Sequence, residues 1–393
     1  MSYMARHRQL LSHKMLFRAQ HSLKSDQEMK NSNFIGQQGN KRVAVAMSGG
    51  VDSSVAAALM VERGYQVIGL TLQLYDHGTG TGNQRTCCAG RDIYDARRVA
   101  ARLNIPHYVL DYEDRFKQAV IEDFADSYIR GSTPIPCVRC NERIKFQDLL
   151  GTARNLNADA LVTGHYARRI ATRGSRELHK ASNLSRDQSY FLFTITPEQL
   201  DYLRFPLGGL EKDQTRDLAE NFDLPVAAKP DSQDICFVPD GDYARTIEKL
   251  RPEAAEPGDI VLEDETIIGQ HAGIIHFTVG QRRGLGIAWP EPLYVLRLIP
   301  DTREVVVGPK SSLQVTRITL NNVNWLKPAM TVSKEVKLTV KIRSAHRGTP
   351  ALVRALPNGR AEIDFDHTPG AVSPGQAAVF YDSSRLIGGG WIE

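Results

Sequence analysis

The cysteines of this sequence have the spacing of reactive thiols. Cys137 and Cys140 are three residues apart and precede a helical stretch that we expect to begin near Glu142. A thiol at a helix N-terminus is expected to have a lowered pKa and raised reactivity, because the helix dipole stabilises the thiolate. Cys236 lies far along the chain in a polar turn, but sequence distance does not prevent contact with Cys140 in the fold. These thiols are candidates for sulfur chemistry or metal binding.

A glycine-rich segment, Ser48-Gly49-Gly50-Val51-Asp52-Ser53-Ser54, follows an apolar run and opens a helical stretch. The free N–H groups and positive end of a helix start form an anion site. Gly49 and Gly50 let the backbone close around a phosphate, and the serine hydroxyls are placed to donate to its oxygens. A Walker loop would need lysine where Val51-Asp52 stands. The segment predicts a different polyphosphate site, with Asp52 a candidate for holding Mg²⁺; the simpler interpretation makes Asp52 an N-cap in a glycine turn.

Strands that alternate with helices surround these residues from Lys41 onward. Apolar runs at Val43–Met47, Gln66–Leu74, His107–Asp111 and Ala160–Thr163 predict strands, and the stretches Asp52–Arg63, Asp92–Leu103, Glu113–Ile129 and Glu142–Leu156 predict helices. This order predicts a doubly wound parallel sheet with helices on both faces, which is an α/β fold.

The pattern changes after about residue 240, where Gly, Pro and β-branched residues replace helical periodicity. Short alternating runs at Val336–Ile342, Ala351–Ala355, Ala361–Phe365 and Ala377–Tyr381 are separated by Pro-Gly-type turns and predict an antiparallel β-barrel. We expect a basic, disordered extension at 1–40, a catalytic domain at 41–240, a small β-rich central domain at 241–310 and a C-terminal barrel at 311–393.

Composition excludes few classes of protein. The chain is 41% hydrophobic with a net charge of +4, and no apolar run reaches the length of a membrane span. Residues 1–40 carry six Lys/Arg and two acids and residues 311–393 carry ten and six, so both ends are basic, which permits a polyanionic partner or is ordinary solvated charge. Five cysteines without a secretory signal predict a reducing compartment, which we expect to be the cytoplasm. The basic N-terminal segment also resembles a mitochondrial presequence, so the mitochondrial matrix is the alternative.

Several motifs together resemble the tRNA-specific 2-thiouridylase (MnmA/TrmU) family, and the SGGVDS loop resembles that of the N-type ATP pyrophosphatases. The resemblance runs from about Lys41 to the C-terminus in the family's order and spacing. It rests on SGGVDSS, GLTLQLYD (Gly69–Asp76), the PCVRCN run, TGHYAR (Thr163–Arg168), RDQSYFL (Arg186–Leu192), DSQDICF, FTVGQRRGLGI (Phe277–Ile287) and SPGQAAVFY (Ser373–Tyr381).

The resemblance implies a reaction and its partners. The enzyme would use ATP to adenylate the C2 oxygen of the wobble uridine in tRNAs such as those for Lys, Glu and Gln. Sulfur would arrive from a sulfur carrier protein as a persulfide on Cys236. Cys140 would act as the nucleophile that releases this sulfur and leaves a transient Cys140–Cys236 disulfide, a thiol–disulfide exchange.

The resemblance also implies roles for single positions. The positions that match ATP contacts are Ala46, Met47, Ser48, Gly49, Gly50, Val51, Asp52, Ser53, Leu72 and Gly164. The positions that match tRNA contacts are His165, Arg186, Asp187, Gln188, Arg343, Ser344 and Gln376. Without the resemblance, His165 is better interpreted as an interior histidine after a strand, and we interpret Cys87-Cys88 as structural or incidental.

One departure from the family pattern keeps alternatives open. Many members carry Asp where this chain has Cys137, so an acid/base role cannot be transferred to this position. Cys137, Cys140 and Cys236 have the number and spacing of ligands for an iron–sulfur cluster, which gives an iron-dependent tRNA thiolase as the alternative. Synthetases with the same ATP loop would need no paired thiols, and a non-catalytic RNA-binding module would not turn over ATP.

Overall fold

The computed structural model describes residues 41–393 except 76–87, 173, 232–234, 239–240 and 327–334. The predicted extension at 1–40 and Cys87 lie outside the described residues, and so does the side chain of Cys88. The chain divides into two compact units. Unit 1 contains the residues up to Tyr112, Leu149–Ser189 and Pro197–Ser232, and unit 2 contains Glu113–Asp148, Tyr190–Thr196 and Gln233–Glu393.

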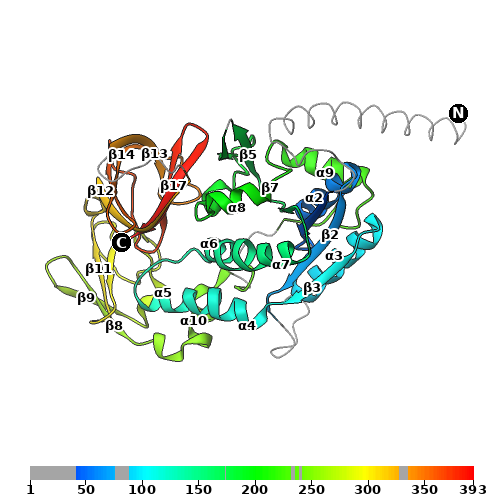
Figure 1. Cartoon of the computed structure of the whole chain (residues 1–393). Helices are drawn as coiled ribbons and strands as arrows, with labels where there is room; N and C mark the ends of the chain where they lie inside the picture. Colours follow the sequence, from blue (N-terminus) through cyan, green and yellow to red (C-terminus); the bar gives the residue numbers. More distant parts are fainter. Residues whose placement is uncertain (1–40, 76–87, 173, 232–234, 239–240, 327–334) are drawn as a thin grey trace, which may run out of the picture. The chain divides into compact units, whose positions relative to one another are not determined.

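A five-stranded parallel sheet of order β3-β2-β1-β4-β7 lies at the centre of unit 1 (Figure 1). Its strands are β1 (Arg42–Ala46), β2 (Gln66–Gln73), β3 (His107–Asp111), β4 (Ala160–Val162) and β7 (Leu203–Arg204). β1 pairs with β2 on one side and β4 on the other, and its residues 43–45 are fully buried. Burial on both faces explains its continuous apolar run. The predicted parallel α/β sheet is confirmed.

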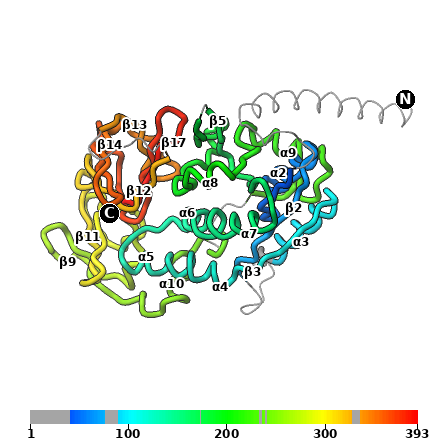
Figure 2. Tube along the Cα trace, viewed as in Figure 1, coloured from blue at the N-terminus to red at the C-terminus, as the bar shows by residue number. Residues whose placement is uncertain are grey.

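Helices with small or apolar inner faces pack against this sheet. α2 (Val51–Glu62) buries Val55, Ala56 and Leu59 against Val43 and Val45, and it lies alongside β1 and β2 in the trace of Figure 2. The other helices of unit 1 are α3 (Cys88–Leu103), α7 (Leu150–Asn155), α8 (Pro197–Tyr202) and α9 (Lys212–Asn221). An antiparallel hairpin of β5 (Ala167–Thr172) and β6 (Ser175–Lys180) completes the elements of unit 1.

The helices of unit 2 include two stretches of π-helix. The predicted helix Glu113–Ile129 is one continuous run of α4 (Glu113–Phe116), the π-helix η1 (Lys117–Glu122) and α5 (Asp123–Ile129). α6 (Pro136–Arg139) continues into the π-helix η2 (Cys140–Leu149). Short π-helical segments are rare and often occur at functional sites. α10 (Tyr243–Leu250) and the 3₁₀ turns η3 (Ser189–Leu192), η5 (Pro252–Ala254), η6 (Ile274–His276) and η7 (Lys310–Leu313) are the remaining short helices that the structure describes.

Two β structures follow in unit 2. A four-stranded sheet of order β10-β11-β8-β9 is built from β8 (Gly258–Val261), β9 (Ile267–His271), β10 (Tyr294–Ile299) and β11 (Glu304–Gly308). The second is a six-stranded antiparallel barrel, closed because β17 pairs with both β16 and β12. Its strands are β12 (Arg317–Trp325), β13 (Glu335–Lys341), β14 (Thr349–Leu356), β15 (Arg360–Phe365), β16 (Ala377–Asp382) and β17 (Arg385–Ile392).

The predicted C-terminal barrel is confirmed, and alternating residues such as Leu338, Val340, Val353 and Ile363 form its core. The sequence did not indicate β17, because three successive glycines erase its period-two pattern. A Cβ at Gly388 would lie 2.4 Å from the Asn324 carbonyl oxygen, so the glycine lets β17 approach β12 closely. Within the described residues, no helix is both long and apolar enough to cross a membrane.

Candidate functional site

The glycine-rich loop connects β1 to α2 in unit 1. Gly49 has a φ of +73°, and a Cβ there would lie 2.2 Å from the Asp92 carbonyl oxygen, so only glycine fits. The Ser48 N–H donates to the Ser53 hydroxyl at 3.1 Å, and the Ser53 hydroxyl lies 3.2 Å from the Gly50 carbonyl oxygen. The Ser54 hydroxyl is fully buried and donates to the same carbonyl at 2.7 Å. The expectation that Ser54 reaches a phosphate is therefore wrong, because its buried hydroxyl is bonded to the Gly50 carbonyl oxygen.

A second backbone segment meets the start of α2 at Gly164. A Cβ on Gly164 would lie 2.7 Å from the Ser53 nitrogen and 2.9 Å from the Asp52 carbonyl carbon. His165 follows directly, and its Nδ1 lies 2.9 Å from the Thr163 hydroxyl. The segment after β4 thus lies against the first turn of α2, where a helix offers N–H groups to an anion.

Asp52 does not cap the helix but forms a charged network. Its Oδ1 accepts hydrogen bonds from the Tyr166 hydroxyl at 2.9 Å and the Lys212 ammonium at 2.7 Å. Lys212 is nearly buried and also lies 2.8 Å from Asp231. Burial raises the pKa of Tyr166 well above its usual range, and the charge of Asp52 adds to this effect. Burial alone would raise the pKa of Asp231, but the hydrogen bond and charge of Lys212, with two arginines, lower it.

A second lysine, Lys229, contacts the glycine-rich loop. The Lys229 ammonium donates to the Gly49 carbonyl at 3.0 Å and lies 2.7 Å from both Asp92 and Asp95. Burial lowers the pKa of Lys229, but its hydrogen bonds to the two carboxylates outweigh burial and raise it. Sequence reasoning missed Lys212 and Lys229, and the spacing of a local motif could not have found them.

The helix that carries Cys137 and Cys140 begins earlier than the sequence predicted. It starts at Pro136, and the Cys140 N–H bonds to the carbonyls of both Pro136 and Cys137. Cys140 therefore lies one turn inside the helix, and it is buried. Burial raises the pKa of the Cys140 thiol, the charge of Lys145 opposes the rise, and Cys137 adds to it. The predicted lowering of this pKa is wrong, because Cys140 is buried and lies one turn inside the helix instead of at its N-terminus.

Cys236 lies in the same unit and in the same electrostatic cluster. Its neighbour Phe237 packs edge-on against Phe116 and Phe124, with ring centroids 5.8 and 5.3 Å apart. The pKa of the Cys236 thiol is raised to about 12, first by burial among protein atoms and then by the charges of Cys140 and Cys137. The charge of Lys145 lowers it. The residue is nevertheless exposed, so solvent screens part of this shift. The structure thus brings Cys137, Cys140 and Cys236 within range of one another's charges.

Polar side chains fix the π-helix around these thiols. The Lys145 ammonium donates to the Asn141 Oδ1 at 3.0 Å, and the Asn141 amide donates to the Phe191 carbonyl at 3.0 Å. Asn141 is only 3% exposed. A π-helix has more than four residues per turn, so Lys145 lies on the same side as Cys140 and Asn141.

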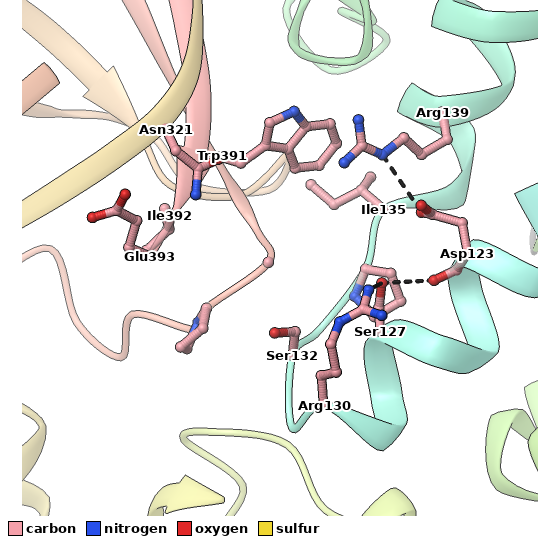
Figure 3. Close-up of a pocket in the computed structure, with 13 residues that line it drawn as sticks. Asp123, Ser127, Arg130, Ser132, Ile135, Arg139, Asn321, Trp391, Ile392 and Glu393 are labelled. Atoms are coloured by element: carbon pink, nitrogen blue, oxygen red, sulfur yellow. Dashed lines mark hydrogen bonds and ion pairs between the residues drawn. The ribbon is translucent and has the colours of Figure 1, made fainter. Parts of the chain in front are cut away.

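Arg139, the residue before Cys140, anchors the helix at a cavity of about 290 Å³. Its guanidinium lies 3.9 Å from the centroid of the Trp391 ring and forms ion pairs with Asp123 at 3.5 Å and Glu142 at 3.0 Å. Figure 3 shows the guanidinium between Trp391 and Asp123. A cation on the face of a tryptophan is a stabilising contact. These contacts join the cysteine helix to the last strand of the barrel.

The positions proposed for tRNA are divided between the two units. In unit 1, Asp187 accepts hydrogen bonds from the N–H groups of Ala181 and Ser189, and Gln188 accepts one from the Tyr166 N–H at 2.9 Å. The side chains of both residues therefore hold the loop, whereas Arg186 is exposed and pairs with Asp231. In unit 2, Arg343 and Ser344 are exposed beyond β13, and the Gln376 amide donates to the Thr133 carbonyl at 3.0 Å.

Comparison with known proteins covers nearly the whole described chain. Residues 41–240 match the model of a tRNA methyl transferase HUP domain, 245–309 a tRNA methyl transferase PRC-barrel domain and 315–392 an aminomethyltransferase beta-barrel domain. The chain is 60% identical over 359 residues to a tRNA-specific 2-thiouridylase MnmA of Rhodospirillum centenum, covering 89% of this chain and 91% of the relative. It belongs to the tRNA-specific 2-thiouridylase family. Similar relatives of the same name occur in Paracoccus denitrificans, at 59% identity over 89% of this chain and 91% of the relative, and in Ruegeria sp. strain TM1040, at 54% over 94% and 99%.

Membership of this family does not favour the iron–sulfur alternative. In the part of the chain that the structure describes, no group of three or more His, Cys, Asp or Glu is arranged to hold a metal ion. Cys137, Cys140 and Cys236 interact through their charges, but they do not form such a group. The same thiols fit thiol–disulfide exchange, which requires two sulfurs to approach each other but does not require three ligands arranged around one metal.

Proposed function

We propose that this enzyme is an ATP-dependent tRNA-uridine 2-sulfurtransferase that makes 2-thiouridine at the wobble position of tRNA. The observation that carries the proposal is the thiol pair of a buried Cys140 and an exposed Cys236 in one electrostatic cluster, in a chain 60% identical to a 2-thiouridylase. The three matched segments support a division into a catalytic domain at 41–240, a central domain at 241–310 and a tRNA-binding barrel at 311–393.

The loop between β1 and α2 suits the triphosphate of ATP. Cβ atoms at Gly49 and Gly164 would collide with backbone, so both positions keep the chain close to the start of α2. We assign ATP contacts to Ala46–Ser53, Leu72 and Gly164. Asp52, at 34% side-chain exposure, is the carboxylate that would hold Mg²⁺, which neutralises phosphate charge when bound. Lys212 and Tyr166 donate hydrogen bonds to this carboxylate and hold it in place.

The chemistry then proceeds in two balanced steps. The C2 oxygen of the uridine attacks the α-phosphate of ATP, and pyrophosphate leaves. The terminal sulfur of a Cys236 persulfide then attacks C2 and displaces AMP, while the Cys140 thiolate attacks the Cys236 sulfur. The persulfide S–S bond breaks and the Cys140–Cys236 bond forms. The two cysteine sulfurs are oxidised to a disulfide, and their electron pair reduces the terminal sulfur, which stays on C2 of the uridine.

The contrasting exposure of the two cysteines fits their roles. Cys236 is exposed, so a persulfide-bearing sulfur carrier protein can reach it, whereas Cys140 is buried and attacks from the protein side. Burial keeps Cys140 protonated between turnovers, and Lys145 supplies the positive charge that favours its thiolate when the reaction requires it. We assign tRNA contacts to His165, Arg186–Gln188, Arg343, Ser344 and Gln376, and we place the enzyme in the cytoplasm.

The decisive experiment is mass analysis of the wobble uridine in the tRNAs for Lys, Glu and Gln from cells with and without this protein. We expect 2-thiouridine only when the protein is present, and purified enzyme with ATP, tRNA and a persulfide donor should restore it. Unmodified tRNA in both assays would refute the proposed function.

A further inference from the structure

Cys137 is a thiol for which the proposed reaction has no use. It lies in the first turn of the cysteine helix, is exposed, and precedes Cys140 by one turn, since the Cys140 N–H bonds to the Cys137 carbonyl. Residues three apart on a helix lie on one face, about 5–6 Å apart at their Cβ atoms. A disulfide needs a Cβ separation only about 1–2 Å shorter, so a small movement at the first turn permits a bond.

The surroundings of Cys137 connect it to the other two thiols. It acts electrostatically on both Cys140 and Cys236, so the three sulfurs belong to one cluster. Lys145 also acts electrostatically on both Cys140 and Cys236. In a Cys140–Cys236 disulfide, the Cys140 sulfur would lie one helical turn from the exposed Cys137 thiol, so Cys137 is placed to attack it from within the protein.

We propose that Cys137 is the resolving thiol of the catalytic cycle. Its thiolate attacks the Cys140 sulfur of the Cys140–Cys236 disulfide, the Cys137–Cys140 bond forms, and Cys236 leaves as a thiolate that takes a proton from solvent. One S–S bond forms and one breaks, so the exchange needs no oxidant. A protein dithiol reductant of the thioredoxin class then attacks the sulfur of the exposed Cys137 and supplies two electrons to the Cys137–Cys140 bond. This inference rests on the proposed function, because that reaction creates the disulfide to be resolved.

Disulfide mapping after one turnover tests the proposal. The full-length enzyme, treated with inorganic polysulfide to load Cys236, is mixed with ATP and tRNA without reductant, then quenched with acid and N-ethylmaleimide. Trypsin cuts after Arg139, so Cys137 and Cys140 fall on separate peptides unless a disulfide joins them. We expect a Cys137–Cys140 bond and an alkylated Cys236 in the wild type, and a Cys140–Cys236 bond in Cys137→Ser.

The 2-thiouridine content of the same samples separates the two hypotheses. Samples without 2-thiouridine refute the proposed function, whereas wild-type samples with 2-thiouridine and any other disulfide refute the role of Cys137 alone. Under multiple turnover, Cys137→Ser should be at least about ten-fold slower than wild type with a protein dithiol, and close to wild type with excess dithiothreitol, which replaces the attack by Cys137. A Cys137→Ser or Cys137→Ala enzyme that matches wild type with both reductants, or is slowed equally by both, overturns the proposal.

Discussion

Lys212 allows a quantitative test of the charged network around the loop between β1 and α2. Its side chain is 8% exposed, and its ammonium lies 2.7 Å from Asp52 and 2.8 Å from Asp231. The substitution Lys212→Met keeps the length of the side chain and removes the charge. Asp52 would retain its bond to Tyr166, and Asp231 would retain its ion pair with Arg216 at 2.9 Å.

The expected cost follows from burial. Removing one partner of a buried ion pair costs about 3–5 kcal/mol. Because both carboxylates keep another partner, we expect the lower end, about 3 kcal/mol. Lys41→Met is the matched control, since Lys41 lies 2.8 Å from Asp159 in the same unit but is 41% exposed. An exposed pair at this distance contributes at most about 1 kcal/mol.

Hydrogen exchange of peptides from β1 and α2 is the suitable assay. The three tryptophans of the sequence, Trp289, Trp325 and Trp391, lie in unit 2, so their fluorescence does not report on this sheet. A loss of 3 kcal/mol should speed exchange of the most protected amides by about 100-fold. If Lys212→Met speeds exchange no more than Lys41→Met does, burial does not set the strength of this ion pair and the reasoning is refuted.

Four further predictions concern chemistry and binding. Asp52→Ala should abolish pyrophosphate release with nearly intact tRNA binding, and unchanged ATP turnover would exclude the loop from the mechanism. With dithiothreitol, Cys140→Ser and Cys236→Ser should each abolish thiolation, while Cys137→Ser should lose only a modest part of the thiolation activity. Equal loss in all three variants, with stoichiometric iron in the wild type, would favour the iron–sulfur cluster interpretation. Because burial raises the pKa of Cys140, its alkylation by iodoacetamide should speed up as pH rises. Lys145→Met should move this pH profile to higher pH, whereas Lys145→Arg, which keeps the charge, should not. An unchanged profile in Lys145→Met would contradict the electrostatic role of Lys145. The affinity for tRNA should fall steeply with salt, and a salt-insensitive affinity would argue against phosphate contacts.

Elements with a strong local pattern could be predicted from the sequence. The strand His107–Asp111 and the helical run Glu113–Ile129 agree with the structure at both ends. The start of the cysteine helix could not be placed, because a segment with two prolines suggests a break. Pro136 instead occupies the first turn, where proline lacks no needed hydrogen bond.

The charged support of the loop depends on contacts that no local pattern contains. Lys212 meets Asp52 across 160 residues of sequence, and Lys229 meets Gly49 across 180. Burial is equally non-local, and it reversed the expected pKa shift of Cys140. The loop motif therefore predicts the place of a phosphate site, whereas the charged groups around the loop were visible only in the fold.

The contact between Arg139 and Trp391 changes how a C-terminal deletion must be interpreted. Removing residues 311–393 would remove basic side chains proposed to bind tRNA, but it would also remove Trp391 from the face of Arg139 and the Ala377 carbonyl from the Tyr190 hydroxyl, 3.0 Å away. Both contacts belong to the framework beside Cys140 and Asn141. Lost thiolation in such a truncation would therefore not distinguish lost RNA binding from a displaced cysteine helix. Arg343→Ala does distinguish them, since Arg343 is exposed and its substitution should weaken tRNA binding and reduce its salt dependence without changing the alkylation profile of Cys140.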